Sequence, residues 1–236
     1  MFLADGACFN RYDHSYVDAT LTQYPNRFRG LFLLNPTVTA SAIGAQVADY
    51  ARRGYVGFRL NPYLWPEGSA IDNDVGHAAF QAASEHSLTV GIMAFHGLAP
   101  LTTAIDRLCA AYPTVNVVLD HVGFVRPNDD QANMAALTSL AQGHPSISIK
   151  ISALFRVSRL AHPHDDMKPL LAELVALVGP DRLLFGTDFP FVTQHGGYAD
   201  SVQLVNKWLV ELETQLDQPL RDAIMPGTSR RLFQLP

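Results

Sequence analysis

Apolar segments of strand length recur along this chain, and helix-length segments separate them. This alternation restricts the fold more than any other feature. The strand-length segments are nearly continuous in apolar or β-branched residues, which is typical of parallel strands covered on both faces. They are 30–35, 56–60, 88–95, 115–120, 147–151 and 183–187.

The helix-length segments have recognisable ends. One stops at Gly54 and another stops before Pro113, and these residue types commonly end helices. Repeated strand-helix units without a linker predict a single domain over residues 1–236. The predicted helices are 16–24, 41–53, 74–87, 101–112, 130–142 and 167–178.

The number of strands bears on whether the sheet can close. Segment 1–4 matches the end of one further strand, whereas a (β/α)8 barrel needs eight. We therefore expect an α/β fold, a (β/α)8 TIM barrel that is N-terminally incomplete and lacks its first strand and helix. Its open edge predicts self-association as a homo-oligomer or poor solubility. An open doubly wound sheet is the alternative, although no Gly-x-Gly-x-x-Gly follows the first strand.

Composition limits the partners. The 22 acidic and 17 basic residues give a net charge of −5, and no basic stripe of a nucleic-acid binder is present. No apolar run approaches the roughly 20 residues of a membrane span, and no signal-peptide pattern is present. Cys8 and Cys109 lack metal or redox spacing, which favours reduced cytoplasmic thiols, with a disulfide left open. We expect a cytoplasmic protein that binds a small-molecule substrate, no nucleic acid and no membrane.

Polar side chains follow several predicted strands. In a barrel these strand ends face one pocket. A single such residue is more often a cap or an ion-pair partner, but several in register predict a functional rim. These residues are Arg59, His96, Asp120, His121, Lys150, Ser152 and Asp188.

Several segments at these strand ends resemble a known family. The chain resembles the amidohydrolase-related barrels, and within them the lactonases typified by 2-pyrone-4,6-dicarboxylate lactonase. The resemblance spans essentially the whole chain and implies a (β/α)8 barrel that hydrolyses a lactone. The matching segments are Gly57-Phe58-Arg59-Leu60-Asn61, Leu119-Asp120-His121-Val122-Gly123, Lys150-Ile151-Ser152, Gly186-Thr187-Asp188-Phe189-Pro190 and 226–233.

The resemblance also implies roles for individual residues. Asp188 corresponds to the general base for the attacking water, and His121 to the histidine that polarises the carbonyl or binds a metal. His121 and Asp188 are thus the candidate ligands of a divalent ion such as zinc, with a metal-free site as the alternative. A carboxylate and an electrophilic group suit these two tasks.

The remaining rim residues are expected to bind substrate. Arg59 and Arg156 match substrate-binding arginines of the family. Arginine suits this task because its guanidinium pairs bidentately with carboxylates. His96, Lys150 and Ser152 are expected at the same rim.

The sequence also departs from the family pattern. The His-x-His pair of the family's first strand is absent, and His162-Pro163-His164 is interpreted as a solvated loop or helix N-cap rather than a replacement. Phe124 and Trp65 stand where the dicarboxylate lactonases have arginines, which favours a less charged, sugar- or aromatic-derived lactone. Trp65 is expected either to form an apolar wall or to pack on its neighbours, and His195 is a further candidate lining residue.

Two alternatives to an active lactonase stay open. One is an inactive or truncated remnant, which the nucleotide sequence upstream of Met1 would test. The other is a non-oxidative decarboxylase of the same barrel family, which release of carbon dioxide would reveal.

Overall fold

A curved parallel sheet forms the centre of the molecule. The computed structural model describes residues 2–4, 11–127 and 130–235. Within them, seven strands pair in the order of the sequence, each parallel to the next. The strands are β1 (Phe2–Ala4), β2 (Arg29–Leu33), β3 (Tyr55–Leu60), β4 (Thr89–Ile92), β5 (Val117–Leu119), β6 (Ile147–Ile151) and β7 (Leu183–Phe185).

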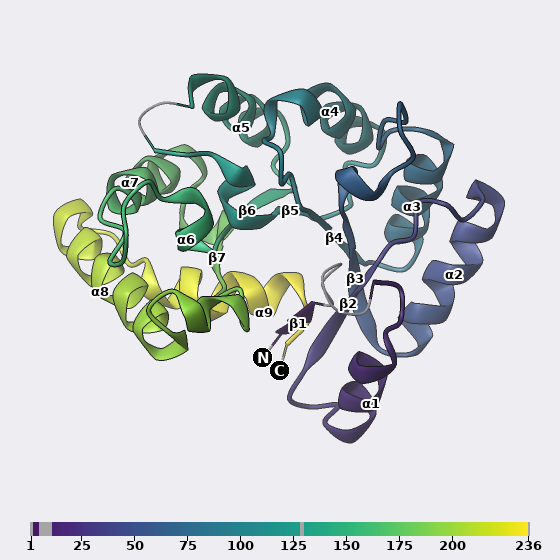
Figure 1. The fold of residues 1–236 in the computed structure, drawn as a ribbon, viewed down its shortest axis with the longest axis horizontal. Coiled ribbons are helices and arrows are strands. Elements are labelled where there is room, and N and C mark those ends of the chain that lie inside the picture. Colours follow the sequence, from purple (N-terminus) through teal and green to yellow (C-terminus); the bar gives the residue numbers. More distant parts are fainter. Residues whose placement is uncertain (1, 5–10, 128–129, 236) are drawn as a thin grey trace.

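Helices connect the strands and cover the outer face of the sheet (Figure 1). The α-helices are α1 (Ser15–Gln23), α2 (Ala40–Arg52), α3 (Asp74–Glu85), α4 (Thr102–Ala111), α5 (Gln131–Gly143), α6 (Leu154–Val157), α7 (Met167–Val178), α8 (Tyr198–Leu216) and α9 (Thr228–Leu232). Shorter helical turns are η1 (Pro62–Leu64), η2 (Ala99–Leu101), η3 (Asp120–Phe124), η4 (Pro180–Arg182), η5 (Phe191–Gln194) and η6 (Ala223–Gly227).

This arrangement confirms the predicted α/β fold. Among the described residues β1 pairs only with β2 and β7 only with β6, so the sheet is an incomplete (β/α)8 barrel. The open edge is visible in Figure 1 between β1 and β7. The predicted strand 147–151 and helix 167–178 have the bounds of β6 and α7. The predicted strands 88–95 and 115–120 are longer than the observed β4 and β5.

Two apolar clusters hold the barrel together. The larger packs the outer faces of the strands against the helices. The smaller fills the barrel interior, where Leu31, Val118 and Leu184 meet Leu232 and Phe233 from the C-terminal segment. The Thr89 hydroxyl donates to the Leu232 carbonyl at 2.9 Å and fixes this segment against β4. The interior is therefore closed by side chains below the carboxyl ends of the strands.

The structure also bears on two expectations from composition. In the part of the chain that it describes, no helix combines the length and the apolar character that crossing a bilayer requires. Cys109 is a buried free cysteine, whereas Cys8 lies outside the described residues.

Candidate active site

A buried cluster of charges lies where β3, β5 and β6 end. The Nε atom of Arg59 lies 2.9 Å from Oδ2 of Asp120, and Lys150 Nζ donates to Asp120 Oδ1 at 3.1 Å. The Arg59 contact is ionic rather than a directed hydrogen bond, since Nε has no acceptor in line with it. Asp120 thus contacts two cations, one from β3 and one from β6, across the interior of the barrel.

One glycine on β4 and one directly after β7 lie beside these side chains. A Cβ at Gly186 would lie 2.7 Å from Lys150 Cε, which is closer than real Cβ contacts occur. A Cβ at Gly91 would lie 3.7 Å from Asp120 Oδ2, at ordinary contact distance. Because strand residues alternate between faces, these positions line the same interior as Arg59. A side chain at position 186 would therefore displace Lys150 from its present position.

The two cations keep Asp120 ionised. Asp120 is only 3% exposed, and burial alone would raise its pKa because it disfavours the charged form. The positive charges of Arg59 and Lys150 outweigh burial and hold the pKa of Asp120 well below its usual range. A buried carboxylate between two cations therefore stays negative at neutral pH.

The second group of the site joins His121 to Asp188. His121 Nδ1 lies 2.8 Å from the Ser152 hydroxyl, and its Nε2 lies 3.8 Å from Asp188 Oδ1. Arg156 Nε donates to the other oxygen of Asp188, Oδ2, at 2.9 Å. The imidazole and the carboxylate are therefore each anchored on one side and face each other on the other side.

His121 is neutral at ordinary pH. Burial lowers its pKa to about 4, although the negative charges of Asp120 and Asp188 act in the opposite direction. A neutral imidazole carries one proton, so one ring nitrogen donates and the other accepts. When the Ser152 hydroxyl donates to Nδ1, the proton sits on Nε2, beside Asp188.

The backbone at these strand ends is left-handed. His121 and Val122 have φ angles of 53° and 56°, and Asp188 has a φ of 60°. Residues other than glycine adopt this region rarely, and then mostly where the surrounding structure enforces it. The turns after β5 and β7 therefore place His121 and Asp188 on rigid backbone.

The rim also contains residues that the structure keeps apart from this pair. His96 is exposed after β4, with its ring 5.2 Å from that of Phe95. In the described residues it shares no hydrogen bond or ion pair with His121 or Asp188. Exposed His195 stacks on Phe155 at 4.2 Å instead.

The structure decides between the two alternatives for Trp65 and corrects the expectation for His164. Trp65 is 7% exposed and belongs to the main core, so it packs on its neighbours and does not form an apolar wall. His164 is buried and donates from Nδ1 to the Leu160 carbonyl at 2.9 Å, so it is not solvated. Asp166 stands at the N-cap of α7 but makes no side-chain cap bond; it accepts from Ser158 and from the backbone N–H of Arg159. The segment is a loop in which His162, Pro163 and Asp165 are exposed, as expected, and only His164 is buried.

The donor set for a metal consists of His121 Nε2 and Asp188 Oδ1, which face each other. Protein zinc sites use three or four protein ligands. In residues 2–4, 11–127 and 130–235, no three His, Cys, Asp or Glu side chains are grouped to hold a metal ion. The two donors alone do not meet that requirement, so the chemistry below is derived from the chain's own groups.

Sequence reasoning missed the part played by Asp120. It placed Arg59 and Lys150 at the rim as substrate binders, whereas both contact Asp120 in the structure. The sequence shows that Asp120 directly follows an apolar strand, but Arg59 lies on β3, two strands away from β5. The pairing depends on how far each side chain reaches across the barrel, which the sequence does not show.

Two curated relatives are similar in sequence. A 4-sulfomuconolactone hydrolase of Hydrogenophaga intermedia is 27% identical over 207 residues, which cover 85% of this chain and 64% of that enzyme. An L-fucono-1,5-lactonase of Burkholderia multivorans is 30% identical over 148 residues, covering 56% and 47%. The chain thus spans less than two-thirds of the length of both relatives.

Solved structures share the fold. A Pseudomonas putida protein described as a 2-pyrone-4,6-dicarboxylic acid hydrolase superposes with a TM-score of 0.78 at 22% identity, covering 99% of this chain and 81% of that one. A Burkholderia multivorans amidohydrolase with bound zinc superposes at 0.73 and 20% identity, covering 94% and 78%. At these identities the likeness supports the barrel fold. The amidohydrolase family pattern matches residues 4–235, and the chain therefore belongs to the amidohydrolase family.

Proposed function

We propose that this chain hydrolyses a small lactone, with Asp188 as general base and His121 as the group that polarises the carbonyl. The observation that carries the proposal is the pair of facing groups, His121 Nε2 and Asp188 Oδ1, at 3.8 Å. The separation is too long for a hydrogen bond. The lactone hydrolase and lactonase named among the relatives support a ring ester as the substrate.

The reaction follows from these two groups. A water molecule on Asp188 transfers a proton to the carboxylate while its oxygen attacks the lactone carbonyl carbon. The carbonyl oxygen becomes negative, and the Nε2–H of His121 donates a hydrogen bond to it. The ring C–O bond then breaks, and the proton on Asp188 passes to the leaving alkoxide. The product is an open-chain hydroxy acid.

The surrounding residues act on charge and position. Arg156 holds Oδ2 of Asp188, which leaves Oδ1 directed toward His121. Ser152 fixes the imidazole through Nδ1. Arg59 and Lys150 contribute positive potential below the developing oxyanion, and both act on His121 electrostatically. We also propose that five residues of the rim bind the substrate: Arg59, His96, Lys150, Ser152 and Arg156.

Cofactor, partners and location belong to the same proposal. No step is assigned to a metal, because His121 and Asp188 alone are too few donors for zinc. Zinc binding needs further donors, and metal analysis of the purified protein tests for them. The net charge of −5 supports a small molecule rather than nucleic acid as the partner, with a cytoplasmic location and a homo-oligomeric state as further proposals.

The decisive experiment compares wild type, Asp188→Asn and a control in turnover of a lactone panel followed by acid release. Asp217→Asn is the matched control, because Asp217 is exposed and also has a positive φ of 49°. We expect Asp188→Asn to lose about 10²- to 10⁴-fold in kcat and Asp217→Asn to match wild type. Equal background turnover by all three proteins would contradict the proposal and favour the remnant alternative. Carbon dioxide release from an aromatic acid would favour the decarboxylase.

A further inference from the structure

A chain of aromatic rings leads outward from the proposed catalytic histidine. The rings of His121 and Phe124 are 5.3 Å apart, those of Phe124 and Phe95 are 5.4 Å apart, and those of Phe95 and Tyr63 are 5.9 Å apart. These residues follow β5, β4 and β3, all at the carboxyl ends of the strands. We call Tyr63, Phe95 and Phe124 the aromatic wall.

The wall changes from buried to exposed along its length. Phe124 beside His121 is 9% exposed, whereas Phe95 and Tyr63 are 46% and 40% exposed. Large aromatic surface next to a polar cluster is typical of ligand sites, because a bound ligand removes that surface from water. Phe124 is therefore the buried inner end of the wall, and the rings of Phe95 and Tyr63 are exposed enough to contact a ligand.

The orientation of the rings indicates a flat ligand group. Neighbouring rings meet at steep angles, 83° between His121 and Phe124 and 68° between Phe124 and Phe95. Aromatic groups gain from edge-to-face and offset contacts beyond the area they bury. A planar ring placed against Phe95 can make such contacts, whereas a puckered saturated ring of the same size gains only the burial.

We propose that the aromatic wall selects lactones that are fused or conjugated to a planar ring, with Phe95 and Tyr63 as specificity-determining residues. This inference rests on the proposed lactonase function of the same site. The ester carbonyl lies at His121, and the planar part extends outward along the wall. The substrate class is therefore an aromatic-derived ring ester rather than a saturated sugar lactone.

The test separates binding from turnover with two lactones of matched size, one with a planar ring and one with a puckered ring. Dihydrocoumarin carries a fused aromatic ring, and octahydrocoumarin carries its saturated counterpart. Affinities are measured calorimetrically on Asp188→Asn, so that the lactones persist during the measurement. We expect dihydrocoumarin to bind about two- to tenfold more tightly. Adding Phe95→Leu should abolish that preference.

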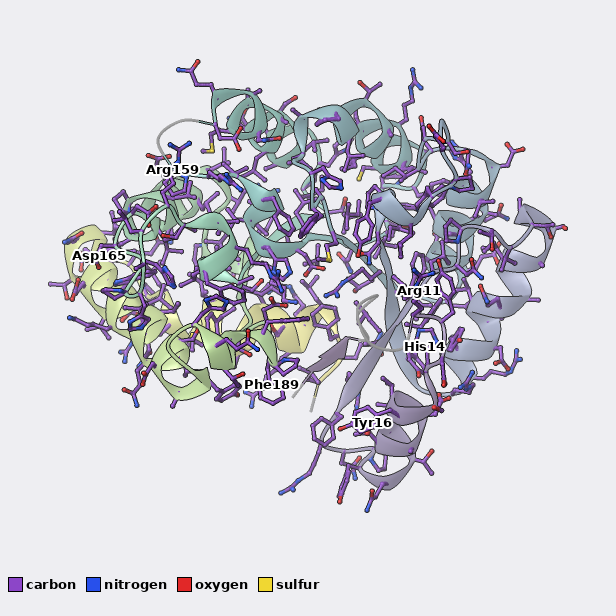
Figure 2. The ribbon with its side chains drawn as sticks, viewed as in Figure 1. Arg11, His14, Tyr16, Arg159, Asp165 and Phe189 are labelled. Carbon is purple, nitrogen blue, oxygen red and sulfur yellow. The ribbon has the colours of Figure 1, made fainter. Side chains whose placement is uncertain are left out.

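The control replaces an exposed aromatic residue elsewhere. Tyr16 is 66% exposed on α1, at the edge of the molecule (Figure 2). Tyr16→Leu in the same background should keep the preference. Equal affinity for both lactones, or a preference that survives Phe95→Leu, would overturn the inference even if the enzyme hydrolyses lactones. A preference that Phe95→Leu abolishes, together with no lactone turnover by the wild type, would support the wall and refute the lactonase proposal.

Discussion

Replacing Asp120 with asparagine tests whether the buried charge cluster stabilises the barrel. The substitution keeps the size and shape of the side chain but removes its negative charge. Arg59 and Lys150 have side chains only 10% and 12% exposed. They would face each other around a neutral amide, without the carboxylate that now separates them.

The expected loss is large for a single substitution. Removing one partner of a buried ion pair typically costs about 3–5 kcal/mol, because the remaining charge stays buried without compensation. We take the lower end of this range, because the amide of asparagine can still accept from Lys150, and expect about 3 kcal/mol of unfolding free energy to be lost at pH 7. A domain with a total stability of about 5–15 kcal/mol would remain folded.

Urea unfolding of wild type and variant measures this difference. A lower midpoint at an unchanged slope reports stability alone. The matched control is Asp49→Asn, because Asp49 also pairs with two arginines, Arg52 and Arg53, but its side chain is 51% exposed. Exposed ion pairs contribute about 0–1 kcal/mol. A loss below about 1 kcal/mol for Asp120→Asn, equal to the control, would refute the reasoning.

The pH dependence of the same pair of proteins has a definite sign. The pKa of Asp120 is lowered in the folded state. Its contribution is therefore fully present above its unfolded pKa of about 4 and is lost as the pH falls toward the folded value. The stability difference between wild type and Asp120→Asn should narrow below about pH 4.

Three further predictions concern single side chains. Ser152→Ala removes the partner of His121 Nδ1, and we expect about a tenfold lower kcat at unchanged KM in steady-state kinetics. Gly186→Ala would press on Lys150 and should cost about 1–3 kcal/mol in urea unfolding. His14 is buried, accepts a backbone N–H at Nε2, and has a pKa lowered mainly by burial. Its contribution to stability should be present above about pH 6.5 and lost as the pH falls, and His14→Gln should weaken this dependence in unfolding measured from pH 7 to pH 5.

The sequence was most informative where local chemistry sets the boundary of an element. Helix α7 was predicted to end before Gly179, and it does so because glycine readily adopts the positive φ of 72° found there. The predicted strand 115–120 was too long because the left-handed turn that begins at His121 ends β5 at Leu119. Valine rarely adopts a positive φ, so the presence of valine at position 122 did not predict that turn.

The candidate site could likewise be predicted from the sequence only in part. Parallel topology brings the strand ends together, and this allowed Asp188 and His121 to be placed at one rim from the sequence. The union of Arg59 and Lys150 on Asp120 was not predictable, because it depends on side-chain reach across the interior. Trp65 likewise stands on a loop whose path into the core no local pattern specifies.

The left-handed turns at the strand ends make some positions of the site sensitive to substitution, whereas positions on ordinary backbone tolerate it. Left-handed backbone costs on the order of 1–3 kcal/mol for each such residue, and His121 and Asp188 both have this conformation. Substitutions there disturb backbone that the rest of the barrel holds in place. Phe95 and Tyr63 stand on backbone without a positive φ and are 46% and 40% exposed. Phe95 can be exchanged at little structural cost, whereas Tyr63 also accepts from the amide of buried Asn61. New substrate preferences would therefore arise at the outer rim, while the hydrolytic pair stays fixed.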